Sequence, residues 1–364
     1  MERIIQAPSR YIQGENGLLK LAVYMKQLGG SYAYLLADGF SAKSFANLLP
    51  RSFLEEGLRY QLEELKGECC LSEIDRHCQL LRKEGCDCVI GVGGGKALDT
   101  AKAISYYTRL PLIVAPTAAS MDGPCSGLAV LYTEDGVFDH YLHLRTNPAV
   151  VVADTSVISK APPRLLAAGM GDALSTYYEA NACQLSQATT DTGAHSTNAA
   201  RTLARLCLDT ILRDGAAAYA AAEYGVQTPA LENIIEANLY LSCIGFESGG
   251  LAAAHALHNG LTLLPQTRKS MHGEIVAFCT IAQLVLENRS PDEIRQIQRF
   301  CRSVKLPITL AEIGLGDCPE ESLRQAAAAS LGSNSYMNHM PFQVSADDAY
   351  AALKVADRLG NQYS

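Results

Sequence analysis

Three of the eight histidines in this chain fall within one short stretch, SGGLAAAHALHNGLTLLPQTRKSMHGE, at residues 248–274. His255 and His258 are three positions apart in an alanine-rich run that predicts a helix, so they share one helix face. His272 follows fourteen positions later, beside a glycine and a glutamate. An imidazole on an apolar face costs free energy unless its nitrogens find partners. A lone histidine of this kind is usually a satisfied core residue, whereas three so close together favour a metal site.

A catalytic divalent metal needs about three protein ligands and one open coordination position. Two imidazoles and one carboxylate form a donor set that suits Zn²⁺ or Fe²⁺. The carboxylate candidate is Asp172, which follows two glycines in AAGMGDALSTYYEA and is expected to open a helix. An aspartate at that position also serves as a simple helix N-cap, and the spacing leaves both interpretations open. Spacing also does not decide which two of the three histidines bind.

A glycine-rich junction lies between the strand-like run CDCVIGV and the helical pattern KALDTAKAISYYTR, at residues 86–109. The dinucleotide pattern G-x-G-x-x-G fails because Lys96 stands where the last glycine belongs, and Ala97 replaces the hydroxyl residue of a P-loop. Consecutive glycines still allow backbone N–H groups to approach a pyrophosphate at the start of a helix. The alternative is a tight turn that needs positive φ angles.

Two aspartates stand at the ends of strand-like segments. Asp38 follows an apolar run, where an acid can bind ribose hydroxyls, although an Asp-Gly turn explains it equally well. Asp122 precedes Gly123 and Pro124, which by itself suggests an Asx turn.

The elements that must position these residues divide the chain in two. Near-continuous apolar runs at 32–39, 86–95, 110–117 and 148–156 predict strands buried on both faces of a parallel sheet. Helical spacing at 72–85 and 96–109 alternates with them, and 128–144 reads as a hairpin around EDG. Beyond Ala161–Pro163 alanine-rich helical patterns dominate. We therefore expect an N-terminal α/β domain at residues 1–161 and an all-α domain at residues 162–364.

The composition of the 364 residues excludes several classes of partner. The net charge is −8 and no basic block is present, which argues against nucleic acid and anionic membranes. No apolar run is long enough to span a membrane, and the N-terminus MERIIQAPSRY does not resemble a signal peptide. The twelve cysteines form no CxxC pair, so we expect reduced thiols in a cytoplasmic protein.

Five motifs taken together resemble the glycerol dehydrogenases of the iron-containing (group III) alcohol dehydrogenase superfamily. They are GVGGGKALDTAKA, PTAASMDGPCSGLAVLYT, GMGDALSTYYEA, AAAHALHNGL and MHGEIVAFCT. The similarity extends over almost the whole chain, from APSRYIQGENGLLKL to ADDAYAALKVADRLG.

The resemblance implies a Rossmann-like first domain, a helical second domain, and an active site in the cleft between them. It implies a divalent metal, usually zinc with iron or manganese as alternatives, held by Asp172, His255 and His272, with His258 nearby as a catalytic candidate. Asp122 matches the substrate-contacting aspartate. The residues that match the NAD contacts are Asp38, Gly93, Gly94, Gly95, Lys96, Ala97, Leu98, Thr117, Ala118, Ser126, Leu128 and Tyr132.

The function implied is oxidation of glycerol, or a similar vicinal diol, to dihydroxyacetone by hydride transfer to NAD, in a homo-oligomer that is commonly an octamer. One alternative is a related dehydrogenase that acts on glycerol 1-phosphate or a 2-hydroxy acid, for which Arg268 and Lys269 are the nearest basic pair in sequence. Others are a lyase like 3-dehydroquinate synthase and a non-catalytic ligand-binding protein. No residue stands out as the proton acceptor, for which His258 and a chain of waters are the candidates.

Overall fold

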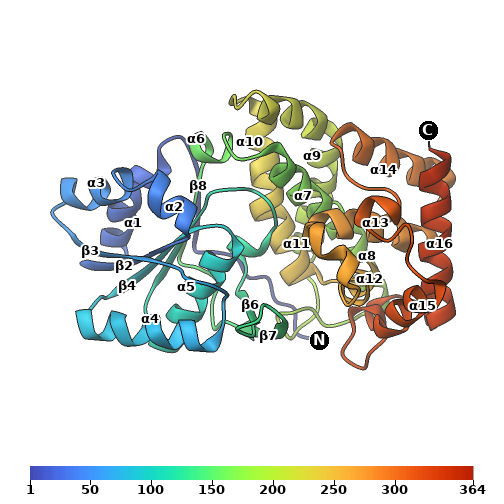
Figure 1. Cartoon of the computed structure of the whole chain (residues 1–364), viewed down its shortest axis with the longest axis horizontal. Coiled ribbons are helices and arrows are strands. Elements are labelled where there is room, and N and C mark those ends of the chain that lie inside the picture. Colours follow the sequence, from blue (N-terminus) through green and yellow to red (C-terminus); the bar gives the residue numbers. More distant parts are fainter. Residues whose placement is uncertain (364) are drawn as a thin grey trace.

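The computed structural model describes residues 1–363 and shows two lobes side by side (Figure 1). The N-terminal lobe holds a six-stranded sheet in which each neighbouring pair is parallel, in the order β1-β8-β5-β4-β2-β3. Its strands are β1 Arg10–Gly14, β2 Tyr32–Ala37, β3 Arg59–Glu64, β4 Cys88–Gly93, β5 Leu112–Pro116 and β8 Val150–Asp154. Every residue of β2, β4, β5 and β8 is buried, which confirms the strands predicted from apolar runs.

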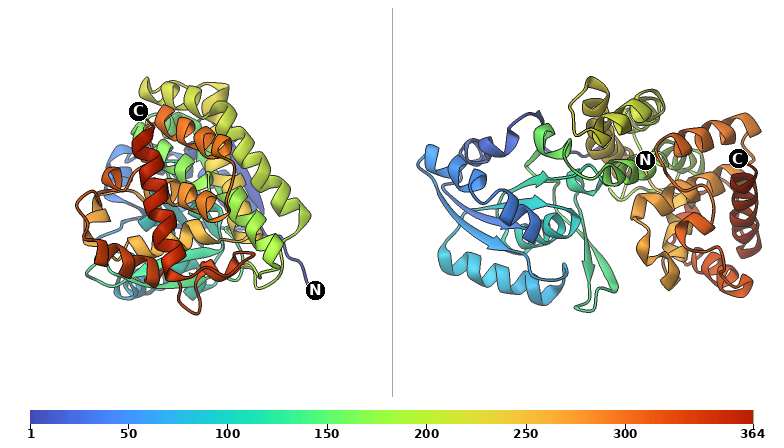
Figure 2. Two further views of the ribbon diagram at one scale, coloured as in Figure 1. Left: turned by 90° about the vertical axis from the view of Figure 1, so that its right-hand side faces the viewer. Right: turned by 45° about the horizontal axis from the view of Figure 1, so that its top comes forward.

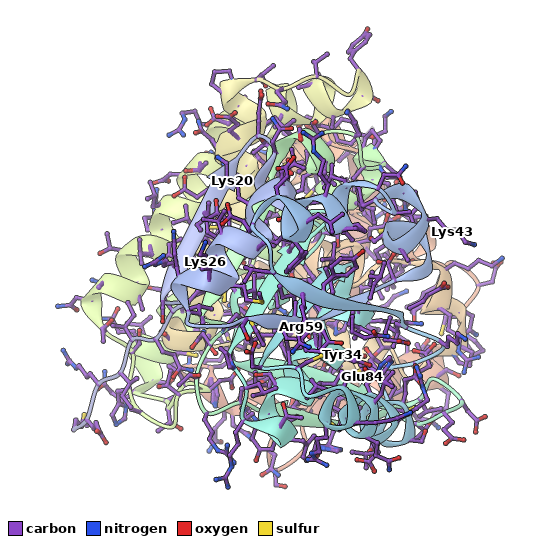
Figure 3. All side chains as sticks on the ribbon, turned by 90° about the vertical axis from the view of Figure 1, so that its left-hand side faces the viewer. Lys20, Lys26, Tyr34, Lys43, Arg59 and Glu84 are labelled. Atoms are coloured by element: carbon purple, nitrogen blue, oxygen red, sulfur yellow. The ribbon has the colours of Figure 1, made fainter. Side chains whose placement is uncertain are left out.

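Helices cover both faces of this sheet. One face packs against the short helix η1 Gly17–Lys20 and α1 Leu21–Gln27, α2 Gly39–Ser44 and α3 Leu48–Glu55, and the other against α4 Leu71–Glu84 and α5 Gly95–Thr108. Figure 3 views this end of the molecule, with Lys26 and Lys43 above the edge strand that carries Arg59, and Glu84 of α4 below it. The N-terminal lobe is therefore the predicted α/β domain, built on a parallel sheet.

The two edge strands are absent from the sequence-based prediction. β1 and β3 are only half buried, and their sequences RYIQG and RYQLEE lack a continuous apolar run. β1 pairs with the buried strand β8, and β3 pairs with the buried strand β2. This backbone pairing holds both edge strands in the sheet. The predicted hairpin is confirmed as the antiparallel pair β6 Leu128–Tyr132 and β7 Phe138–His143, which lies at the lower side of the molecule between the lobes (Figures 1 and 2).

The C-terminal lobe is helical, as predicted, and no strand follows β8 among residues 1–363. The first long helix begins at Pro163, and the division of domains after residue 161 stays a prediction. Its longer elements are α7 Pro163–Ala173, α8 Thr176–Ser186, α9 Asn198–Glu223, α10 Pro229–Glu236, the π-helical turn η3 Ala237–Leu241, α11 Ser242–Gly249, α12 Ala253–Leu261, α13 His272–Leu286, α14 Pro291–Ser303, α15 Glu320–Ala329 and α16 Ala346–Gln362.

Short helices connect them: α6 Thr155–Ile158 after the sheet, η4 Pro265–Lys269, η5 Ala311–Ile313 and η6 Tyr336–His339. One apolar core continues from the α4–α5 face of the sheet into this lobe. Within the described part of the chain, no helix combines the length and apolar character that a membrane crossing requires.

Candidate metal and dinucleotide site

The structure brings Asp172, His255 and His272 together, although they come from three different helices. One possible ligand atom from each lies within 4.8 Å of the others. The Nε2 atom of His272 is 3.1 Å from Oδ1 of Asp172, and Nε2 of His255 is 3.4 Å from the same oxygen. The three donors therefore converge on one point, as a metal site requires.

Asp172 does not open a helix, so the N-cap interpretation is wrong. It lies one residue before the last residue of α7 and is buried. The glycines before it serve close packing instead. A Cβ atom on Gly169 would lie 2.0 Å from the carbonyl oxygen of Ala119, and one on Gly171 would lie 2.3 Å from that of Gly273. Glycine thus allows the end of α7 to approach both the 117–122 loop and the start of α13.

Glu179 of α8 is fully buried and holds His255 in place. Its Oε2 accepts a hydrogen bond of 2.6 Å from Nδ1 of His255, and its Oε1 accepts from the backbone N–H groups of Ala252 and His255 at 2.8 and 3.0 Å. Because Nδ1 is engaged, Nε2 is the nitrogen that faces Asp172. One side chain thus caps α12 and fixes the ring of its histidine.

His258 also joins the cluster, but away from Asp172. Its Nε2 lies 2.9 Å from Nδ1 of His272, and its Nδ1 lies 3.0 Å from Oδ1 of Asn259. Burial lowers the pKa of His258 well below its usual value, and the positive charges of His272 and His255 add to this effect. These surroundings therefore favour the neutral form of the ring.

The charges in the cluster shift the pKa values of its members in different directions. Burial would raise the pKa of Asp172, but His272 and His255 outweigh it and hold that pKa well below its usual range. Burial raises the pKa of Asp122, and the negative charge of Asp172 adds to the rise. Burial would lower the pKa of His255, yet the carboxylates of Glu179 and Asp172 raise it well above its usual value.

This donor set fits a divalent cation. Asp172 and Glu179 place two buried carboxylates in one region, and among residues 1–363 only histidines form ion pairs with them. Buried carboxylates need a counter-charge, which protonated histidines or a bound cation can supply. Two imidazole nitrogens and a carboxylate oxygen are the ligands that zinc and iron accept.

Asp122 lies beside the cluster and does not form the Asx turn that its sequence suggested. Its side chain makes no capping bond to the following turn; its Oδ2 instead accepts a hydrogen bond of 2.7 Å from the hydroxyl of Ser242. Its backbone N–H donates to Oδ2 of Asp172 at 3.4 Å. Nearby, Nδ2 of Asn238 donates to the carbonyl oxygen of Ala119 at 2.9 Å. The π-helical turn η3 and the residue after it thus hold both ends of the 119–122 segment.

The glycine junction lies at the carboxyl end of β4, where α5 begins. Gly93 has a φ of 144°, and a Cβ atom there would lie 2.2 Å from Oδ2 of Asp38. Asp38 caps α2 by accepting from the N–H of Ser41 at 2.7 Å, and it also accepts from the N–H of Gly94 at 2.9 Å. A Cβ atom on Gly94 would meet nothing within 4 Å. The turn therefore exposes backbone at the helix start, which is the geometry that a phosphate needs.

The other predicted cofactor residues continue from this junction. Ala97 and Leu98 are buried in α5, and exposed Lys96 forms an ion pair with Glu68 at 2.5 Å. The N–H of Thr117, next to Ala118 in the loop after β5, donates to the carbonyl oxygen of Gly93 at 3.1 Å. The loop and the turn are therefore side by side.

Ser126, Leu128 and Tyr132 lie on the segment that enters the hairpin. Burial raises the pKa of the Tyr132 phenol to about 12. The fully buried ammonium of Lys102 donates to Oγ of Ser126 at 3.2 Å and to the carbonyl oxygens of Leu128 and Gly123 at 2.7 and 2.6 Å.

Sequence reasoning missed several of these supporting residues. Lys102 stands in the apolar helix KALDTAKA, where a lysine needs a polar partner, and that contrast was a usable signal. Glu179 follows Asp172 in the same motif. Buried Glu247 accepts from the N–H of Gly127 and from Asn147 at 2.7 and 2.6 Å, and its partners lie 120 and 100 positions away. No local pattern identifies such contacts.

Comparison with known proteins gives a consistent result. Residues 8–155 match the protein family described as iron-containing alcohol dehydrogenase. A glycerol dehydrogenase of Pseudomonas putida is 46% identical over 363 residues, which cover 100% of this chain and 99% of that protein. A crystal structure of a probable glycerol dehydrogenase from Sinorhizobium meliloti 1021 has a TM-score of 0.93 at 40% identity, covering 99% of this chain and 100% of that one. The glycerol dehydrogenase structure from Schizosaccharomyces pombe has a TM-score of 0.92 at 36% identity, covering 99% and 92%.

Proposed function

Because the chain belongs to the iron-containing alcohol dehydrogenase family, we propose that it oxidises glycerol, or a similar vicinal diol, to dihydroxyacetone with NAD as hydride acceptor. The observation that supports this best is the convergence of Asp172, His255 and His272 within 4.8 Å, beside a turn suited to a dinucleotide. The similarity to glycerol dehydrogenases along the whole chain favours a polyol as the substrate.

The three converging side chains would hold the divalent metal, which we propose to be zinc, with iron or manganese as alternatives. When bound, such an ion lowers the pKa of a hydroxyl in its open position and so prepares it for oxidation. Asp172 would supply the negative charge, and the two imidazoles would supply nitrogen donors once the metal has displaced their protons.

The dinucleotide would lie along the carboxyl end of the sheet, with its pyrophosphate in the open space beside Gly94 at the start of α5. Asp38 is hydrogen-bonded to that backbone and is the proposed ribose contact. The further contacts proposed are Gly93, Gly95, Lys96, Ala97, Leu98, Thr117, Ala118, Ser126, Leu128 and Tyr132. Lys102 would support this surface from below by fixing the segment after Gly123.

Asp122 would bind the second hydroxyl of the substrate. Ser242 holds its carboxylate at 2.7 Å, and its own backbone touches Asp172. This contact places the proposed substrate residue directly beside the proposed metal ligand. A diol with neighbouring hydroxyls matches two adjacent polar positions of this kind.

The anionic-substrate alternative has less support. Arg268 and Lys269 are both exposed in η4. Arg164, which lies near them, is already engaged by both carboxylate oxygens of Glu274, at 2.6 and 2.7 Å, and by the carbonyl oxygen of Lys269. A phosphate or carboxylate would need convergent cations that are free to bind it.

We further propose that the chain acts in the cytoplasm as a homo-oligomer, an octamer by resemblance. Twelve unpaired cysteines suit a reducing compartment. Sedimentation of the purified protein would measure the number of copies.

The test is a substrate panel. The purified protein is reconstituted with Zn²⁺ or Mn²⁺, supplied with NAD⁺, and assayed by absorbance of NADH with glycerol, 1,2-propanediol, glycerol 1-phosphate and 2-hydroxybutyrate. We expect the diols to be oxidised fastest. A signal with none of the four would return the lyase and non-enzymatic alternatives.

A further inference from the structure

The two histidines of the proposed metal site differ in what lies behind them. A neutral imidazole carries one N–H and one lone pair, so it can bind a metal through Nε2 only when Nδ1 carries the hydrogen. That hydrogen needs an acceptor, which fixes both the tautomer and the orientation of the ring. The structure supplies such an acceptor for each ring, and the two are chemically different.

For His255 the acceptor is a carboxylate. Glu179 lies 2.6 Å from Nδ1 and leaves Nε2 directed at Asp172. Its second oxygen is occupied by two backbone N–H groups at the start of α12, so the carboxylate cannot rotate away without losing them.

For His272 the acceptor is another histidine. Nδ1 of His272 can donate to Nε2 of His258 only if that nitrogen has a lone pair, which places the hydrogen of His258 on its Nδ1. Oδ1 of Asn259 lies 3.0 Å from that Nδ1 and accepts it. The chain of donors thus runs from His272 through His258 to Asn259, and Nε2 of His272 faces Asp172 at 3.1 Å.

We propose that Glu179 and the His258–Asn259 pair are positioning residues that fix the metal-binding tautomers of His255 and His272. This inference rests on the proposed metal site. It gives His258 a role in orienting His272, which is separate from any role in proton transfer. The sequence-based hypothesis that His258 or a chain of waters accepts the proton stays a prediction. The two roles differ in one measurable respect, because only a positioning residue changes the affinity for metal.

The test measures zinc affinity by competition with a chromophoric chelator, on the full chain without NAD or substrate. Outer partners of histidine ligands typically change metal affinity by about 10–100-fold. We expect losses in that range for Glu179→Gln, which keeps the shape and removes the charge, and for His258→Ala. The absorption bands of the Co²⁺-substituted protein should also shift in both variants, because ligand orientation changes.

The matched control is Glu247→Gln. Glu247 is also a buried glutamate that accepts a backbone N–H, but its partners are Gly127 and Asn147 rather than a histidine. The zinc affinity of the Glu247→Gln variant should equal that of the parent protein.

A second pair of variants keeps the test decisive if Glu179→Gln or His258→Ala does not fold. Asn259 is exposed, so its replacement disturbs little packing. Asn259→Asp keeps an acceptor for His258 and should retain zinc affinity, whereas Asn259→Leu removes it and should weaken binding.

Four results overturn the proposal, part of it or its basis. Parental zinc affinity in both Glu179→Gln and His258→Ala contradicts it, and a loss in only one of them removes the role of the other. Equal affinity in Asn259→Asp and Asn259→Leu contradicts the relay through His258. Parental zinc affinity in Asp172→Asn would instead show that the metal site itself is elsewhere, which separates failure of this inference from failure of the proposed function.

Discussion

The glycine turn and the histidine cluster are both candidate binding regions, but they are assembled in opposite ways. The turn between β4 and α5 is contiguous in sequence and offers backbone, with Gly94 open to its surroundings. The cluster offers side chains from α7, α12 and α13, and Asp172 and His272 are 100 positions apart. The candidate phosphate site is therefore built by a continuous motif, whereas the candidate metal site depends on the packing of the whole helical lobe.

Among the tests of this contrast, removal of the metal should have the largest effect on the rate of glycerol oxidation. A chelator should reduce glycerol oxidation by about 1,000-fold or more, since a bound ion contributes several kcal/mol to such a step. NADH binding, which we propose to depend on the turn, should be unchanged when measured by fluorescence titration. Added Zn²⁺ should restore the rate. Loss of NADH binding together with the metal would contradict the independence of the two regions.

Replacement of Lys102 by methionine should have the next largest effect, which is a loss of stability. Its buried ammonium holds three oxygens of the 123–128 segment and lies 3.7 Å from the carboxylate of Asp99. Breaking a buried pair by removing one partner typically costs about 3–5 kcal/mol. We expect a lower unfolding midpoint in denaturant and weaker NADH binding.

The control for that variant is Lys96→Met, for stability only. Lys96 is exposed and its ion pair with Glu68 is at the surface, where such pairs contribute about 0–1 kcal/mol. An equal loss of stability in the two variants would contradict the structural role of Lys102.

A smaller effect is expected from a single methyl group in the turn. The Cβ atom added by Gly94→Ala would meet no protein atom within 4 Å, so the variant should fold with parental stability. The methyl group would occupy the approach of the pyrophosphate, and we expect the NADH dissociation constant to rise about tenfold, which is about 1.4 kcal/mol. Calorimetric titration measures it, and parental affinity would place the cofactor elsewhere.

The matched substitution in the other region is Gly171→Ala. Its Cβ atom would lie 2.3 Å from a backbone oxygen of Gly273, so α7 and α13 must separate. Zinc affinity should fall in Gly171→Ala, whereas NADH affinity should not change because the glycine turn is unaltered. This is the reverse of the result expected for Gly94→Ala.

The smallest effect is expected from the exposed basic pair of η4. The double substitution of Arg268 and Lys269 by alanine should change kcat/KM for glycerol by less than about twofold, because neither side chain is placed to bind a neutral diol. A large loss confined to an anionic substrate would revive the alternative based on glycerol 1-phosphate or a 2-hydroxy acid.

The same contrast between local motifs and long-range packing explains which elements the sequence could predict. The buried strands β2, β4, β5 and β8 were predictable because both of their faces are apolar. The edge strands β1 and β3 were not, because their partners, rather than their own residues, define them. The glycine junction was visible as a local motif.

The metal cluster was only partly predictable. Its residue types stood out, yet Asp172 was equally compatible with a helix cap, because the glycines that permit close packing of α7 resemble those of a turn. The choice of His255 and His272 over His258 rested on resemblance. Glu179 was missed because its partner His255 lies 76 positions away and only the fold brings them together.

The rate of NADH formation from glycerol by the zinc-saturated Asp172→Asn variant tests the central claim most directly. The substitution keeps the shape of the side chain and removes the charge on which both histidines converge. The account predicts a loss of about 1,000-fold or more, with NADH binding at the parental level. A rate within tenfold of the parent protein would contradict it, because the reaction would then not depend on this cluster.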